Sequence, residues 1–261
     1  MTQPTTRVAL VTGATSGIGL AVARQLAAQG HRVFIGARTA ENVVSTVKQL
    51  REEGLDADGT DVDVRSTDSV QRFVQAGVAA FGEIDVLVNN AGISGGGVTA
   101  DVPEDLWDNV IDTNLNSVFR LTSAVLNTGG MRTKNWGRII NIASTAGKQG
   151  VVLGAPYSAS KHGVVGFTKA LGNELAPTGI TVNAVCPGYV ETPMAHQVRK
   201  NYAALQNTTE EAVLAKFQAK IPLGRYCTPE EVAGMVGYLA SDTAASITAQ
   251  ALNVCGGLGN F

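Results

Sequence analysis

The sequence predicts an α/β domain built around a single doubly wound, seven-stranded parallel sheet. Seven short apolar runs alternate with segments of helical length through most of the 261 residues. Strands that are apolar along their whole length are typical of parallel sheets covered by helices on both faces. No linker or internal repeat separates these units, so we expect one domain over residues 1–261, large enough to bury a core without disulfides or a metal.

The expected strands are the apolar runs at positions 8–12, 32–35, 57–62, 84–88, 138–142, 180–185 and 251–254. The expected helices lie between them, from a glycine-rich turn to about residue 29, then at 41–53, 67–81, 104–127, 157–176 and from 228 onward. The last of these begins with Thr228-Pro-Glu-Glu231. That order of residues places an N-cap, a proline at the first helical position and a glutamate at the third.

One polar, helical segment, residues 195–220, interrupts this alternation between the sixth strand and the last helix. It follows the C-terminal end of a strand, where ligands bind in doubly wound sheets. We therefore expect a helical substrate lid, although the same composition also suits a surface filler.

Charge and composition exclude several classes of protein. Twenty Lys and Arg residues against 22 Asp and Glu give a net charge of −2, which provides no general attraction to nucleic acid or to an anionic membrane. The three cysteines form no CxxC motif, and Cys186 and Cys255, which close apolar runs, are expected to be buried thiols. Three scattered histidines give no support to a metal site. The N-terminus is not leader-like and no apolar run reaches about 18 residues, so we expect a soluble, cytoplasmic protein.

The first chemical motif is the turn between the first strand and the first helix, Thr12-Gly-Ala-Thr-Ser-Gly-Ile-Gly19. Its GxxxGxG spacing differs from the GxGxxG dinucleotide pattern, and a glycine-rich turn alone is most often only a turn. At the start of a doubly wound sheet, however, missing side chains let a diphosphate approach the N–H groups of the helix. The turn has no lysine, which argues against a P-loop.

The end of the second strand indicates which dinucleotide is bound. A carboxylate here would bind the ribose 2′-OH of NAD, but the sequence has Ala37 followed by Arg38. A guanidinium at this place can pair with a 2′-phosphate, so NADP is better supported, with an ordinary surface arginine as the alternative. Asp63, after the third strand, suits either an adenine amino group or the cap of the next helix, and its spacing favours the cap.

Four polar residues suit the reduction of a ketone, in which hydride addition builds negative charge on oxygen. Tyr157 and Lys161 are four apart and share one helix face. An ammonium group about 4 Å away would lower the pKa of the phenol from about 10 to about 7 in a partly dry site. Ser144, at the end of the fifth strand, is placed to donate to the carbonyl, and Asn114 interrupts an apolar helical pattern. From spacing alone, all four also suit ordinary structural roles.

Together these motifs resemble the short-chain dehydrogenase/reductases along the whole chain. The matching residues are those at 12–19, Asp63, Asn89-Asn90-Ala91-Gly92, Asn114, Ser144, Tyr157-Ser-Ala-Ser-Lys161 and Pro187-Gly188. Within that family, residues 147–152, 155–172, 180–188 and the ending ALNVCGGLGNF are most similar to the ketoreductases of aromatic (type II) polyketide synthases. The resemblance implies a Rossmann-type fold and a homotetramer.

The resemblance also assigns the four polar residues as a catalytic tetrad. It implies that Tyr157 is the general acid, and that Lys161 tunes Tyr157 and binds the nicotinamide ribose. Ser144 would orient the carbonyl, and Asn114 would hold a water molecule of a proton relay. The implied NADPH site consists of Gly13, Thr15, Ser16, Gly17, Ile18, Gly19, Arg38, Asp63, Val64, Asn90, Ala91, Gly92, Tyr157, Lys161, Pro187, Gly188, Val190 and Thr192.

The substrate implied by the resemblance is a poly-β-ketone tethered through phosphopantetheine to an acyl carrier protein and reduced at one ketone, commonly C9. Ser94 replaces a proline of related enzymes, which removes a φ restraint from its loop. Of three arginines in the family's carrier-protein groove, Arg38 and Arg65 are present, and Ile93 replaces the third. The implied pocket consists of Ser94, Gly95, Gly96, Gln149, Val151, Met194 and Tyr202.

Two alternatives stay open at this point. A 3-oxoacyl-acyl-carrier-protein reductase of fatty acid synthesis would have the same tetrad and the same cofactor, and the size of the pocket would distinguish it. A cofactor-binding scaffold without turnover is disfavoured, because all four residues of the tetrad are present.

Overall fold

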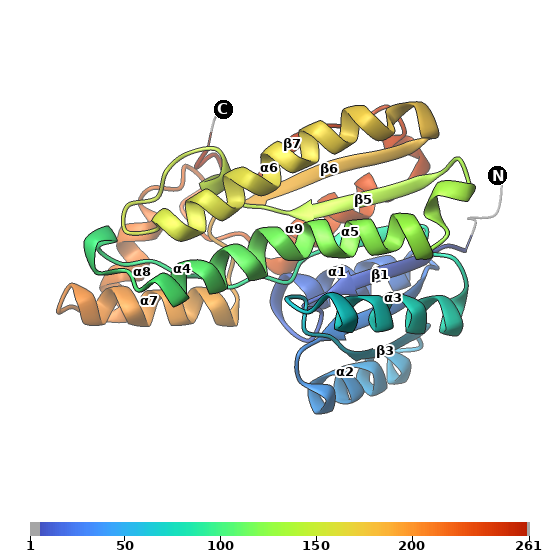
Figure 1. Ribbon diagram of the computed structural model, residues 1–261. Coiled ribbons are helices and arrows are strands. Elements are labelled where there is room, and N and C mark those ends of the chain that lie inside the picture. Colours follow the sequence, from blue (N-terminus) through green and yellow to red (C-terminus); the bar gives the residue numbers. More distant parts are fainter. Residues whose placement is uncertain (1–5, 260–261) are drawn as a thin grey trace.

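The computed structural model describes residues 6–259, in which seven parallel strands form one sheet (Figure 1). Their order across the sheet is β3-β2-β1-β4-β5-β6-β7, so the direction of winding reverses between β1 and β4. Ligands bind outside the C-terminal ends of the strands at such a reversal. The predicted fold class is confirmed. The strands are β1 (Val8–Thr12), β2 (Arg32–Ala37), β3 (Ala57–Asp61), β4 (Val86–Asn89), β5 (Gly137–Ile142), β6 (Ile180–Pro187) and β7 (Ala251–Val254).

Helices cover both faces of the sheet. α1, α2 and α9 pack on one face through residues such as Leu26 and Val236, and α3, α5 and α6 pack on the other through residues such as Phe73 and Leu171. The central strands β1, β5 and β6 are accordingly buried along their whole length. The helices are α1 (Gly17–Ala28), α2 (Ala40–Glu52), α3 (Thr67–Phe81), α4 (Glu104–Ile111), α5 (Ser117–Thr128), α6 (Ala155–Leu175), α7 (Pro193–Leu205), α8 (Glu210–Gln218) and α9 (Pro229–Leu239).

The single helix predicted over 104–127 is interrupted in its middle. A π-helical turn, Asp112–Asn116, separates α4 from α5 and contains Asn114. The side chain of Asn114 bonds to the backbone of Ile93 in the loop after β4. Single π turns within α-helices are frequent at functional sites, and this one brings an amide to the C-terminal edge of the sheet.

The polar insertion predicted over 195–220 contains α7 and α8, which pack against each other at one end of the molecule (Figure 1). Phe217 of α8 stacks on Tyr189, and Tyr189 stacks on Tyr226, with ring centroids 4.8 and 5.2 Å apart. This aromatic stack attaches the insertion to the segments that follow β6 and precede α9.

Several local predictions are confirmed as well. Thr228 caps α9 in a capping box with Glu231, and Cys186 and Cys255 are buried free thiols, as is Cys227, for which no prediction was made. In the described part of the chain, no helix is both long enough and apolar enough to cross a membrane.

Candidate active site

The glycine turn after β1 leaves the start of α1 open to a ligand. Gly13 and Gly17 have φ of +64° and +53°, in the left-handed region that favours glycine. A Cβ on Gly19 would overlap the carbonyl oxygen of Gly13. Ser16 is the N-cap of α1, but its side chain makes no capping hydrogen bond, and no acidic residue lies in the first turn. The first N–H groups of α1 therefore suit an anion such as a diphosphate.

Hydrogen bonds hold the loop after β4 against this turn. The side-chain amide of Asn90 donates to the carbonyl oxygens of Thr12 (2.9 Å) and Gly13 (3.1 Å), and Thr12 Oγ1 accepts from the backbone N–H of Asn90 at 3.2 Å. Thr192, at the start of α7, lies on a third side, because a Cβ on Gly17 would be 3.2 Å from its Cγ2. The segments after β1, β4 and β6 thus converge at one edge of the sheet.

The remaining residues predicted for the cofactor lie along the same edge. They occupy the glycine turn and α1, the loops after β3 and β4, and the segment from β6 to α7. In chain order they are Thr15, Ile18, Val64, Ala91, Gly92, Pro187, Gly188 and Val190.

Arg38 stands at the C-terminal end of β2, where its side chain is exposed. Ala37, the last residue of β2, pairs with Asp61 at the end of β3. The residue directly after β2 is therefore a cation, Arg38, and not a carboxylate. This is the arrangement expected for a site that accepts a 2′-phosphate.

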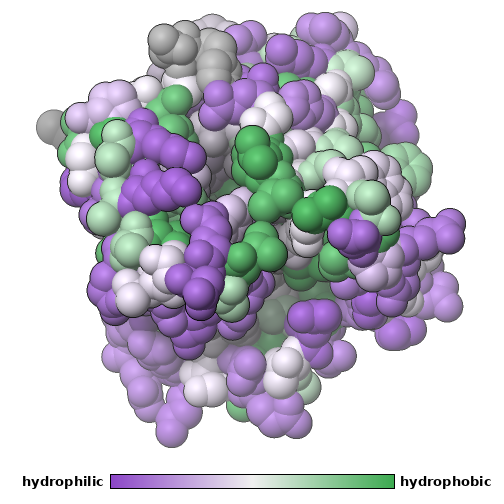
Figure 2. All heavy atoms as spheres, turned by 90° about the vertical axis from the view of Figure 1, so that its left-hand side faces the viewer, coloured by the Kyte–Doolittle hydropathy of each residue, from purple (hydrophilic) through white to green (hydrophobic). Residues whose placement is uncertain are grey.

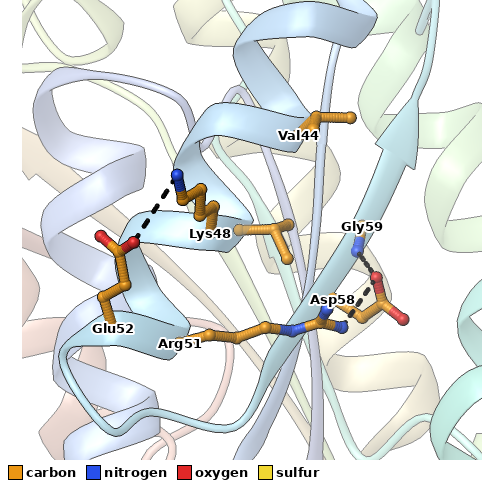
Figure 3. A pocket seen from close by; sticks show the side chains of 7 residues that line it. Val44, Lys48, Arg51, Glu52, Asp58 and Gly59 are labelled. Carbon is orange, nitrogen blue, oxygen red and sulfur yellow. Dashed lines mark hydrogen bonds and ion pairs between the residues drawn. The ribbon is translucent and has the colours of Figure 1, made fainter.

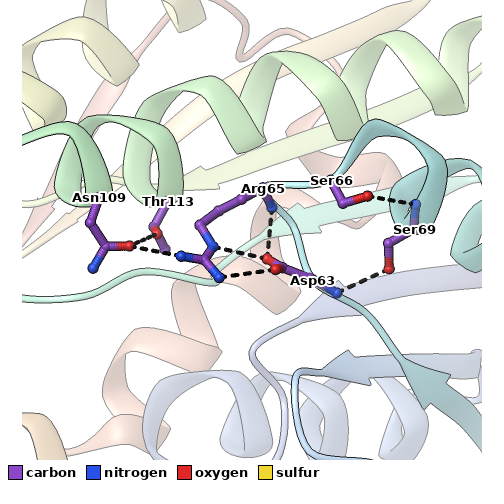
Figure 4. A network of polar contacts seen from close by, with 6 residues as sticks. All are labelled: Asp63, Arg65, Ser66, Ser69, Asn109 and Thr113. Atoms are coloured by element: carbon purple, nitrogen blue, oxygen red, sulfur yellow. Dashed lines mark hydrogen bonds and ion pairs between the residues drawn. The ribbon is translucent and has the colours of Figure 1, made fainter. Parts of the chain in front are cut away.

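Asp63, after β3, is held by its neighbour Arg65 (Figure 4). Arg65 has the largest lowering effect on the pKa of this carboxyl, and Arg38 lowers it further. The interpretation of Asp63 as the cap of α3 is wrong. The N-cap is Ser66, whose hydroxyl accepts from the N–H of Ser69 at 3.3 Å, while the Asp63 carboxylate is turned to Arg65.

Three of the predicted catalytic residues meet beside the end of β5. Ser144 follows β5, and its Oγ accepts from the N–H of Ala146 at 3.0 Å. Helix α6 carries Tyr157, which hydrogen-bonds with Ser144, and Lys161, whose Nζ donates to the carbonyl oxygen of Ile142 at 2.8 Å. The hydroxyls of Ser144 and Tyr157 are therefore placed to bind one substrate oxygen together.

Asn114 completes the group from the π turn. Its Oδ1 accepts from the N–H of Ile93 (2.8 Å), and its Nδ2 donates to the carbonyl oxygen of Ile93 (2.9 Å) and to Ser160 Oγ (3.1 Å). A Cβ on Gly92 would be 3.3 Å from Asn114 Oδ1 and 3.7 Å from Lys161 Nζ. The structure thus brings all four predicted residues together, and Gly92 lies close to both the Asn114 amide oxygen and the Lys161 ammonium group.

Burial has the largest effect on the pKa values of Tyr157 and Lys161. It raises the pKa of Tyr157 above the ordinary value, against the opposing effect of the hydrogen bond from Ser144. It lowers the pKa of Lys161 to about 8. The predicted fall of the Tyr157 pKa to about 7 is therefore wrong for the protein alone, because Lys161 Nζ is bonded to Ile142 and lies 5.8 Å from the centroid of the phenol ring.

The predicted pocket residues lie in two loops and in α7. Gly96 packs so closely on Leu153 that a Cβ would overlap the carbonyl oxygen of Leu153, and the Tyr202 hydroxyl donates to the carbonyl oxygen of Val152 at 3.1 Å. Figure 2 shows apolar side chains gathered in the middle of the face that carries α7 and α8. Exposed apolar residues of these loops and of α7 are Val98, Val151, Val152, Met194 and Leu205.

Two sets of polar residues that hold the site together were not predicted. Asn141 of β5 donates to Thr168 of α6 at 2.9 Å and accepts from Asn89 at 2.8 Å. The sequence feature that could have indicated this role is the single amide residue in the apolar run RIINI. Arg199 of α7 donates twice to the carboxylate of Glu191, at 2.8 and 3.3 Å. No pattern marks Arg199, because Glu191 lies in an irregular segment.

Comparison with known proteins decides the family. The family model described as short chain dehydrogenase matches residues 7–203. The chain belongs to this family. This short chain dehydrogenase is 79% identical, over the full length of both chains, to a protein of Streptomyces virginiae assigned as the ketoacyl reductase of the monensin polyketide synthase. It is 41% identical over 252 residues, 97% of each chain, to the 3-oxoacyl-acyl-carrier-protein reductase of Escherichia coli K12.

A solved structure gives the same result. The crystal structure of a variant of actinorhodin polyketide ketoreductase with NADPH has a TM-score of 0.96 and 59% sequence identity to this short chain dehydrogenase, and the match covers all of both chains. The resemblance to this family and to its polyketide ketoreductases is confirmed. The chain is an oxidoreductase of the class that uses a nicotinamide cofactor.

Proposed function

We propose that this short chain dehydrogenase is an NADPH-dependent ketoreductase acting on a poly-β-ketone bound to an acyl carrier protein in aromatic polyketide biosynthesis. The observation that carries the proposal is that Ser144, Tyr157 and Lys161 meet at the end of β5, on the same C-terminal edge of the parallel sheet as the glycine turn that suits a dinucleotide. The cofactor and the reaction class agree with those named for the actinorhodin enzyme.

The residues of the site divide the chemistry between them. Bound NADPH supplies the hydride. Ser144 donates a hydrogen bond that orients the ketone oxygen, and Tyr157 gives that oxygen a proton as negative charge develops on it. Lys161, with a pKa of about 8, is cationic at neutral pH and favours the phenolate that Tyr157 becomes. Asn114 fixes the loop beside Lys161, where a water molecule would return the proton from solvent.

Arg38 is proposed to select NADPH over NADH. Arg38→Ala removes charge-assisted hydrogen bonds to the 2′-phosphate, which contribute about 1.5–3 kcal/mol. We expect the KM for NADPH to rise roughly 10–100-fold, while the KM for NADH stays within about twofold. Steady-state kinetics with both cofactors measure this, and an unchanged KM for NADPH would contradict the assignment.

The proposed substrate rests on the similarity to polyketide ketoreductases and on the exposed apolar residues around the predicted pocket. The exposed apolar rim formed by Val98, Val151, Val152 and Met194 suits a long, partly apolar chain. We propose that the ketone reduced is C9, that Arg38 and Arg65 contact the carrier protein, and that α7 and α8 act as the lid. We also propose a homotetramer, supported by the exposed Trp107 and Phe119 on α4 and α5.

The size of the substrate separates this proposal from fatty acid reduction, to which the 41% identity with the E. coli reductase points. We expect a bulky bicyclic ketone to be reduced at least about tenfold more efficiently than a short 3-ketoacyl thioester, a difference of about 1.4 kcal/mol in transition-state binding. NADPH oxidation rates on the purified protein provide the comparison, with the E. coli enzyme as the reference. A preference for the short thioester would replace the proposal with 3-oxoacyl reduction.

A further inference from the structure

Arg65 holds the carboxylate of Asp63 with three donors. Its backbone N–H and its Nε donate to Oδ1 at 3.0 and 3.1 Å, and its Nη2 donates to Oδ2 at 3.0 Å (Figure 4). The backbone of Asp63 is fixed as well, because its N–H donates to Ser69 Oγ at 3.1 Å. Neither the position nor the plane of this carboxylate is therefore free to vary.

A second contact fixes Arg65 itself. Its Nη1 donates to Oδ1 of Asn109, in α4, at 3.2 Å, and Thr113 Oγ1 donates to the same oxygen at 3.4 Å. The guanidinium thus spans from the turn before α3 to α4, just ahead of the π turn that contains Asn114. Arg65 is anchored at both ends although its side chain is 41% exposed.

The three donors leave Asp63 with little remaining capacity to accept. An ionised carboxylate has about four lone-pair sites. Arg65 occupies two on Oδ1 and one on Oδ2, so one acceptor site is left, on Oδ2. An acceptor fixed in direction favours a ligand that presents an N–H there and disfavours one that presents a carbonyl oxygen.

We propose that Arg65 is a positioning residue for the adenine of the cofactor, orienting Asp63 so that its one remaining acceptor site on Oδ2 receives the exocyclic amino group. The inference rests on the dinucleotide site of the proposed function. The low pKa of Asp63, to which the Arg65 hydrogen bonds contribute most, keeps the carboxyl ionised and unable to donate. The site then selects an aminopurine over an oxopurine.

This role differs from carrier-protein docking in what it predicts for a free substrate. Docking through Arg65 would matter only when the ketone is attached to its carrier protein. Positioning of Asp63 would matter with any ketone, and even in the absence of one, because it acts on cofactor binding.

The test measures binding of NADPH and of its hypoxanthine analogue, reduced nicotinamide hypoxanthine dinucleotide phosphate, by nucleotide fluorescence without substrate. We expect Arg65→Gln to weaken NADPH binding about tenfold and to bring the ratio of the two affinities close to one. Arg65→Lys, which keeps a cation, should restore part of the affinity. Asn109→Ala removes one anchor of Arg65 but keeps its three hydrogen bonds to Asp63, so it should weaken NADPH binding less than Arg65→Gln does.

Arg51→Gln is the matched control. Arg51 also pairs with an aspartate of a neighbouring strand, through Nη2 and Asp58 Oδ1 at 3.3 Å, but at the outer edge beside β3 (Figure 3). The Arg51→Gln substitution should leave the affinities for both nucleotides unchanged. The proposal is overturned if Arg65→Gln binds both nucleotides as the native protein does, or loses both equally with the ratio intact. If the native protein reduced no ketone but Arg65→Gln changed the ratio of the two affinities as expected, the proposed function would be refuted and this inference would stand.

Discussion

Tyr157→Phe is expected to lower the rate of ketone reduction about a thousandfold and to leave NADPH binding within about twofold. The change removes only the hydroxyl that gives the ketone oxygen its proton, and positioned general acids contribute about 10²–10⁴-fold. The Tyr157 hydroxyl lies beside Ser144 at the end of β5, whereas the glycine turn that suits the diphosphate lies after β1. Single-turnover reduction of a bicyclic ketone and fluorescence titration with NADPH measure the two effects separately.

Tyr238→Phe is the control for this substitution. Tyr238 lies in α9 with 45% of its surface exposed, so loss of its hydroxyl should change neither rate nor binding. If Tyr157→Phe kept more than about a tenth of the native rate, Tyr157 would not be the proton donor. If the native protein bound NADPH and reduced no ketone, the chain would be a cofactor-binding scaffold.

The sheet and its helices were predictable because each strand is a short apolar run followed by a segment of helical length. The runs that become β1, β5 and β6 are buried along their whole length, which is the pattern of strands in a parallel sheet covered on both faces. The cap at Thr228 was predictable for a different reason, since a capping box is formed by residues three apart. Local chemistry determines such features.

Features that depend on three-dimensional contacts or on burial, which residue spacing does not specify, were not predictable. The π turn Asp112–Asn116 places Asn114 against Ile93, which lies in another loop, whereas the sequence marks Asn114 only as an interruption of an apolar helical pattern. Asp63 was mistaken for a cap because its spacing before α3 is suitable, but Arg65 engages its carboxylate. The pKa of Tyr157 depends on burial, which a four-residue spacing does not specify.

Lys161→Met is expected to abolish most activity and at the same time to stabilise the fold at neutral pH. Lys161 is buried, and its pKa falls from 10.5 to about 8, a change that corresponds to about 3 kcal/mol of unfavourable free energy for the charged form in the folded state. Loss of the hydrogen bond to Ile142 offsets about 1 kcal/mol of the gain. At pH 7 we therefore expect the free energy of unfolding to rise by about 2 kcal/mol while the catalytic rate falls at least about a hundredfold.

The pH dependence distinguishes this cause from simple repacking. Between about pH 8 and 10.5 the unfolded chain keeps the proton that the folded protein has lost at Lys161, so the native protein gains stability as pH rises through this window. The advantage of Lys161→Met should therefore shrink from pH 8 upward and be gone by about pH 10.5. Denaturant unfolding at several pH values measures it, with Lys169→Met, an exposed lysine of the same helix, as the control. If the gain in unfolding free energy of Lys161→Met did not depend on pH, the buried charge at Lys161 would not be what destabilises the native fold.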